Sequence, residues 1–191
     1  MTCRPVTTPA DLAAILEFLN GIGVRAWVHG GWALDALSGS TRPHKDIDLL
    51  VEEKHREPLR AALAGRIIAE MSHKFEVDFD GAEIDLMFFS RTWRGRLVSR
   101  APRILIEWTP AAFGDRTAAV GGVTIPVVEP SVLYVEVADP AGKKREMLDK
   151  NQLDLERVTA LLTPEEREAA RRYYPVRNTL SNRLKLAFGL R

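Results

Sequence analysis

Two acidic residues lie within an otherwise apolar stretch of the chain. Between Asp46 and Val51, the side chains of Ile47, Leu49 and Val51 fall on one face of an extended segment, and those of Asp46 and Asp48 fall on the other. A strand with one apolar face must cover that face in a core, so both carboxylates emerge together from the opposite face. The chain is therefore restricted to folds in which a rigid core strand presents two acids side by side.

A glycine pair precedes this acidic strand. The residues from Val24 to His29 are bounded by glycines and rich in Val and Trp, which predicts a strand that runs directly into Gly30 and Gly31. A short helix is expected from about Trp32 to Leu37, followed by a loop from Ser38 to Lys45. Glycine lacks a Cβ atom, and a helix start carries free amide N–H groups, so this turn is suited to the close approach of phosphate groups.

The remaining pattern predicts a mixed sheet backed by helices, an α+β fold class. An Asp-Gly turn at residues 80–81 joins two alternating segments and predicts a β-hairpin. We expect helices at Asp11 to Asn20, Glu57 to Ala69, Ser131 to Val137 and Lys144 to Leu162, with another opening at Thr163; Gly65 could divide the second of these. Strands are expected at Lys74 to Asp80, Glu83 to Phe89, Arg103 to Trp108 and Val123 to Val128. The predicted division is an N-terminal domain at residues 1–130 and a helical C-terminal region at residues 131–191.

Composition narrows the functional classes. The 27 basic and 26 acidic residues give a net charge of +1, without the broadly basic character of a nucleic-acid-binding protein. The single cysteine, Cys3, excludes an internal disulfide and a multi-cysteine zinc site. The sequence contains neither an apolar run of about 20 residues nor a secretory signal pattern, so a cytoplasmic protein without a membrane partner is expected.

A third acid completes the candidate site. Asp85 lies between apolar neighbours on the second arm of the hairpin, in the phase required to join Asp46 and Asp48; Glu83, on the same face, is the alternative. Carboxylates with positions left for water and phosphate are what Mg²⁺ prefers, and three acids suit a two-metal arrangement. Arg42, just before the acidic strand, is a candidate phosphate ligand beside the glycine pair.

These motifs, in this order, resemble those of a known family. The segments HGGWALD (residues 29–35) and HKDIDL (residues 44–49), with Gly39 and Arg42 between them, are similar to the core of the DNA polymerase beta-like nucleotidyltransferase superfamily. The similarity is greatest to its antibiotic-modifying branch, the aminoglycoside and lincosamide nucleotidyltransferases, in which a tryptophan is familiar at the position of Trp32. The likeness extends from about Leu12 to Phe89, and KNQLDL (residues 150–155) also resembles a late Lys-x-x-x-Asp-Leu helix.

The resemblance implies roles for the candidate residues. Asp46 and Asp48 would hold metal, and Asp85 would bind metal or act as the base on the acceptor hydroxyl. Lys150 would face the nucleotide or the substrate. The expected reaction is attack of a hydroxyl of a small acceptor, an aminoglycoside or a lincosamide, on the α-phosphorus of a nucleoside triphosphate, most often ATP, with two Mg²⁺ ions and release of pyrophosphate.

Other interpretations remain open from the sequence. The basic segment after Glu168 would suit a transferase acting on tRNA or on a protein, and the same fold could serve as a nonenzymatic nucleotide-binding module. Trp93, Trp108 and Phe113 would either wall an acceptor pocket or, as is more common for aromatic residues, lie in the core. Glu107 could contact a cationic acceptor.

Overall fold

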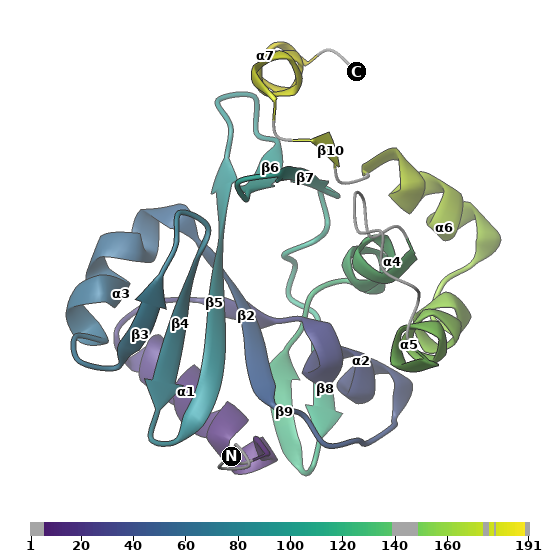
Figure 1. The fold of residues 1–191 in the computed structure, drawn as a ribbon. Coiled ribbons are helices and arrows are strands. Elements are labelled where there is room, and N and C mark those ends of the chain that lie inside the picture. The colour runs from purple at the N-terminus through teal and green to yellow at the C-terminus, as the bar shows by residue number, and fades with distance from the viewer. Residues whose placement is uncertain (1–5, 139–148, 174–175, 178, 190–191) are drawn as a thin grey trace.

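A mixed sheet surrounded by helices forms the body of the protein (Figure 1). The computed structural model describes residues 6–138, 149–173, 176–177 and 179–189. Its helices are α1 (Pro9–Gly21), α2 (Gly30–Ser38), η1 (Glu53–His55), α3 (Arg56–Ala62), α4 (Pro130–Ala138), α5 (Asp149–Ala160), α6 (Pro164–Ala170), η2 (Arg171–Tyr173) and α7 (Leu180–Phe188). Its strands are β1 (Ala26–Val28), β2 (Asp46–Glu52), β3 (Ile67–Glu70), β4 (Lys74–Phe79), β5 (Ala82–Arg91), β6 (Leu97–Arg100), β7 (Ile104–Trp108), β8 (Thr117–Val120), β9 (Val123–Pro126) and β10 (Val176–Arg177).

The long strand β5 organises the sheet. Within the described residues, the path β1-β2-β5-β6-β7-β10 carries β4 and β3 as a branch from β5, and β8 and β9 form a separate hairpin. Strands β2 and β5 are parallel, whereas β5 is antiparallel to β4 along its first part and to β6 at its end. This arrangement confirms the predicted mixed α+β fold and brings the acidic strand next to the second arm of the hairpin.

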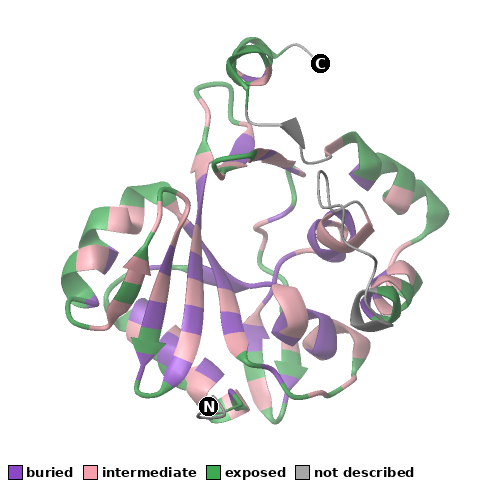
Figure 2. Ribbon diagram, viewed as in Figure 1, coloured by how far each residue is buried: buried purple, intermediate pink, exposed green. Residues whose placement is uncertain are grey.

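Buried residues concentrate along the central strands and on the helix faces that cover them (Figure 2). Ile47 and Leu49 are fully buried, as the alternation in β2 predicts. Helix α1 begins with a capping box between Thr8 and Asp11 and buries Leu12, Ile15 and Leu19. Strand β2 is therefore fixed by the burial of Ile47 and Leu49 on one face, and it presents Asp46 and Asp48 on the other.

The predicted helix from Glu57 to Ala69 is wrong in its second half. Helix α3 ends at Ala62, and β3 occupies Ile67–Glu70. Gly65 lies between them with a φ of 82°, a left-handed conformation that ends the helix and redirects the chain. The pattern also missed β6 and β8, which are only four residues long each.

The C-terminal part packs onto the N-terminal part. Helix α4 begins at Pro130 and contacts α2, α5 and α6, and its buried residues belong to the same hydrophobic cluster as those of α1 and β2. The domain division at residue 130 stays a prediction. Helix α5 lies inside the helix expected from Lys144 to Leu162, whose first five residues lie outside the described residues. In the described part of the chain, every helix is too short or too polar to cross a bilayer.

Candidate functional site

The parallel pairing of β2 with β5 aligns the acids in two neighbouring rows. Asp46 is in register with Glu83, and Asp48 is in register with Asp85. Residues in register on adjacent strands project from the same face of a sheet. The structure thus brings together on one face the three acids predicted from the sequence, Asp46, Asp48 and Asp85, and the alternative, Glu83.

The glycine pair lies directly against this acidic face. Gly30 has a φ of 62°, and a Cβ atom at that position would lie 2.1 Å from Oδ2 of Asp48. The backbone N–H of His29 donates to the carbonyl oxygen of Asp48 at 3.0 Å. Only a residue without a Cβ atom can therefore lie at position 30, because the Asp48 carboxylate packs directly against its backbone.

Electrostatics at Asp48 favour the arrival of a cation. Burial raises the pKa of Asp48 to about 6, an effect that the nearby His29 opposes. The carboxylates of Asp46, Glu136 and Asp85 raise the pKa of Asp48 further, since each disfavours a second negative charge close by. A bound cation would reverse this repulsion, as expected at a site where metal and phosphate meet.

Asp85 is held by a lysine that the sequence analysis did not single out. The Nζ atom of Lys74 lies 2.8 Å from Oδ2 of Asp85 and 2.7 Å from Oε1 of Glu76. Burial lowers the pKa of Lys74, but hydrogen bonds to Asp85 and Glu76 outweigh it and raise the pKa above its usual value. The other oxygen of Asp85, Oδ1, is buried and has no hydrogen-bond partner among the described residues.

His29 links the acidic face to helix α4. Its ring is buried, and Nδ1 lies 3.5 Å from Oε1 of Glu136. Burial lowers the pKa of His29, but Glu136, together with Asp48 and Asp85, raises it above the usual value. Glu136 lies more than 100 residues from His29 in the chain, so no local pattern could have revealed the pair.

A buried aspartate shapes the loop between α2 and β2. Asp35 is 1% exposed and accepts hydrogen bonds from the backbone N–H of Arg42 and from Oγ of Ser40, both at 2.9 Å. Nε2 of His44 also lies 2.9 Å from Asp35. A Cβ atom on Gly31 would lie 2.5 Å from the His44 ring and 2.8 Å from Nη2 of Arg42, so both side chains cover Gly31 closely.

Arg42 connects this loop to α5. Its Nη2 atom lies 3.2 Å from Oδ2 of Asp154, and Nε of Arg42 is buried with no hydrogen-bond partner in the described part of the chain. Asp154 belongs to the Lys-x-x-x-Asp-Leu segment that the sequence analysis noted, and Lys150 lies one turn earlier in α5. The side chain of Lys150 lies outside the described residues.

The donor set suits a hard divalent cation. Among the described residues, no three His, Cys, Asp or Glu side chains converge closely enough to hold a metal ion between them. Mg²⁺ usually takes only one or two protein carboxylates and completes its shell with water and phosphate oxygens. Asp46 and Asp48 on one strand, beside Asp85 whose Oδ1 has no hydrogen-bond partner among the described residues, fit that requirement.

The aromatic candidates for an acceptor pocket lie mostly in the core. Trp108 is buried and donates from Nε1 to Oγ of Ser99, and the Phe113 ring stacks on Phe89 with centroids 3.8 Å apart. Trp93 is exposed, and Glu107 forms a two-point ion pair with Arg96. These contacts give Trp108 and Phe113 a packing role.

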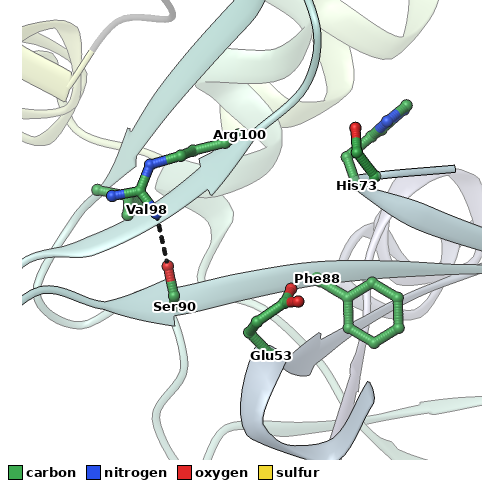
Figure 3. A pocket seen from close by; sticks show the side chains of 7 residues that line it. Glu53, His73, Phe88, Ser90, Val98 and Arg100 are labelled. Carbon is green, nitrogen blue, oxygen red and sulfur yellow. Dashed lines mark hydrogen bonds between the residues drawn. The ribbon is translucent and has the colours of Figure 1, made fainter. Parts of the chain in front are cut away.

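Two cavities in the described part of the chain are not lined by Asp46, Asp48, Glu83 or Asp85. One, of about 210 Å³, is lined by Glu53, Ser72, His73, Phe88, Ser90, Val98 and Arg100 (Figure 3). Because side chains alternate along β5, Phe88 and Ser90 lie on the face opposite Asp85. The other, of about 300 Å³, lies beside Trp32 and Arg42, next to the glycine pair.

Known proteins with similar sequences and folds modify antibiotics. The model of the aminoglycoside-2''-adenylyltransferase family matches residues 11–153. A 2''-aminoglycoside nucleotidyltransferase of Escherichia coli is 38% identical over 63 residues, or 31% of this chain and 36% of that protein, so the match spans about a third of the relative's length.

Two solved structures share the fold. The lincosamide antibiotic adenylyltransferase LnuA, with lincomycin bound, superimposes with a TM-score of 0.64 over 83% of this chain and 100% of LnuA, at 17% identity. The structure of ANT(2'')-Ia in complex with adenylyl-2''-tobramycin gives a TM-score of 0.65 over 86% of this chain and 96% of the other, at 20% identity.

Proposed function

Because the chain belongs to the aminoglycoside-2''-adenylyltransferase family, we propose that it transfers a nucleoside monophosphate, from ATP above other triphosphates, to a hydroxyl group of a small antibiotic of the aminoglycoside or lincosamide class. The observation that carries the proposal is the contact between Gly30 and Asp48, next to Asp85. At this contact, a glycine backbone that could bind phosphate lies beside carboxylates that could bind a divalent cation. The neighbouring Asp85 has a carboxylate oxygen without a hydrogen-bond partner among the described residues.

The chain's own residues divide the work in this proposal. Asp46 and Asp48 would hold Mg²⁺, which would supply positive charge to the triphosphate. The backbone of Gly30 and Gly31 and the guanidinium of Arg42 bind the phosphates, and Lys150 faces the nucleotide.

Asp85 is the general base in this proposal. Its Oδ1 accepts the proton of the acceptor hydroxyl as the hydroxyl oxygen bonds to the α-phosphorus, and the bond to the leaving pyrophosphate breaks in line with that attack. Because Lys74 already donates to Oδ2, Oδ1 is the oxygen of Asp85 that has no hydrogen-bond partner among the described residues. The product is a nucleotidylated acceptor, and no covalent intermediate with the enzyme is required.

The charge around the site favours a cationic acceptor. The acids Asp46, Asp48, Asp85, Glu76 and Glu136 carry up to five negative charges near this face, whereas Lys74, a protonated His29 and one divalent ion would together supply four. Amino groups of an aminosugar would complement this excess, which supports an aminoglycoside over a neutral sugar. The aminoglycoside relative and the structure with adenylyl-2''-tobramycin support the same preference.

Pyrophosphate release tests the proposal directly. The unaltered chain should release pyrophosphate from ATP only when Mg²⁺ and an accepted aminoglycoside or lincosamide are both present, and Asp48→Asn should abolish the release. Mass spectrometry should find the acceptor heavier by one nucleoside monophosphate minus water. Release that never depends on a small acceptor, together with labelling of RNA or protein, would refute the proposed acceptor class.

A further inference from the structure

Three acids stand in a row across three neighbouring strands. Asp85 on β5 is in register with Asp48 on the parallel strand β2 and with Glu76 on the antiparallel strand β4. Residues in register project from the same face with Cβ atoms about 5 Å apart, and like charges so placed destabilise a sheet. The row therefore needs a counter-charge.

Lys74 supplies that counter-charge at one end of the row. Its ammonium contacts Asp85 at 2.8 Å and Glu76 at 2.7 Å, and its side chain is only 18% exposed. Lys74 is two residues before Glu76 on β4, so its side chain emerges on the same face as the acids. Oδ2 of Asp85 is thus already engaged by a cation that belongs to the chain.

We propose that the Lys74 ammonium acts as a fixed cation at Asp85, so that the site binds one Mg²⁺, on Asp46 and Asp48, rather than the two expected from the sequence. Lys74 is then a positioning residue: it holds Oδ2 of Asp85 and leaves Oδ1 for the acceptor. A second metal ion at Asp85 would have to displace the ammonium from both Asp85 and Glu76. The inference rests on the proposed function, and it adds the number of metal ions that the site binds and the residue that replaces the second ion.

A purely structural role for Lys74 makes a different prediction. If the lysine only relieves repulsion between Glu76 and Asp85, its removal lowers stability but leaves the number of bound metal ions unchanged. If it occupies the place of a metal ion, its removal leaves the carboxylates of Asp85 and Glu76, which both contact the ammonium, to bind a divalent cation there together with water. The number of ions bound per chain therefore distinguishes the two roles.

The experiment counts Mn²⁺, which substitutes for Mg²⁺ and can be measured as free ion by electron paramagnetic resonance. Each protein is titrated with Mn²⁺ in the presence of a nonhydrolysable ATP analogue. We expect one Mn²⁺ per chain for the unaltered protein and two for Lys74→Met, which keeps the aliphatic stem but removes the charge. Lys74→Arg, which keeps the charge, should bind one.

Lys54→Met is the matched control, because Lys54 is an exposed lysine paired with Glu52 outside the site and its loss changes net charge equally. It should bind one ion. Two ions in the unaltered chain would overturn the inference even if Lys74→Met failed to fold, and one ion in a folded Lys74→Met would overturn it as well. Failure of the proposed function would give a different result. In that case no variant would bind Mn²⁺ in a way that depends on Asp48, so adding Asp48→Asn would remove no bound ion.

Discussion

Replacing Gly30 by alanine should disable the site while leaving the fold intact. The new Cβ atom would stand 2.1 Å from Oδ2 of Asp48, whereas ordinary contacts begin at 3.4 Å. Since the rest of β2 is fixed by buried residues such as Ile47 and Leu49, the carboxylate itself must move by about 1 Å. A misplacement of about 1 Å in a catalytic arrangement can reduce the rate roughly 100-fold.

Gly39 provides the matched control at the other end of the same helix. Gly30 and Gly39 have φ values of 62° and 69°, so alanine is strained at both, at a cost of about 1–2 kcal/mol each. A Cβ atom on Gly39, however, would meet nothing within 4 Å. Gly39→Ala should therefore lose stability in urea denaturation but keep its activity per folded molecule.

The assay is kcat/KM for acceptor-dependent pyrophosphate release, measured well below the unfolding transition of each variant. We expect a decrease of roughly 100-fold for Gly30→Ala, equivalent to about 2.7 kcal/mol of transition-state stabilisation, and less than about 3-fold for Gly39→Ala. Equal losses in the two variants would mean that backbone strain alone is responsible. Full activity in Gly30→Ala would mean that the contact with Asp48 does not matter for the reaction.

Two further predictions concern Asp48 and Asp35. Burial raises the pKa of Asp48 to about 6, so the metal-free folded state binds this proton more tightly than the unfolded chain does. The free energy of unfolding should therefore fall as pH rises from about 4 to 6. At pH 7.5 the Asp48→Asn variant should be inactive but more stable than the unaltered chain by up to about 3 kcal/mol. Urea denaturation of both proteins across this pH range checks the prediction, and an Asn variant that gains nothing at pH 7.5 would contradict it. Asp35→Ala should destabilise the fold by about 3–5 kcal/mol, because the buried His44 ring and the part-buried backbone N–H of Arg42 both lose this carboxylate as a partner. The control Asp115→Ala removes an exposed pair with Arg25 and should cost less than about 1 kcal/mol, so similar losses in both would refute the role of Asp35.

Local patterns were sufficient for the elements that carry the acids. Alternation in β2 predicted that Ile47 and Leu49 enter the core, although Leu50 on the acidic face is buried as well. The glycine pair marked the start of α2, where Gly30 adopts a positive φ. The helix prediction failed at residues 63–69, where Gly65 interrupts a sequence whose apolar spacing continues into β3. In that segment the spacing alone does not separate a helix from a strand.

Contacts between distant segments were beyond local patterns. The pair between His29 and Glu136 depends on how α4 packs beside the sheet, and the pair between Arg42 and Asp154 depends on the position of α5. Neither helix position follows from its own sequence, because an apolar face does not specify its partner. The parallel register of β2 with β5 has the same origin, since the two strands are joined through other elements.

The contact between Lys74 and Asp85, in contrast, follows from the hairpin turn. Asp80 and Gly81 both have positive φ values, 54° and 94°, as a two-residue hairpin turn requires. Such a turn pairs Phe79 with Ala82, and counting back along both arms pairs Glu76 with Asp85 and puts Lys74 on the same face. The acids alone indicate two metal ions, because three carboxylates on one face need more than one divalent charge. Lys74 lies on that face, two residues along β4 from Glu76, the partner of Asp85. It supplies part of the positive charge that the carboxylates require, so it lowers the number of metal ions that the site needs.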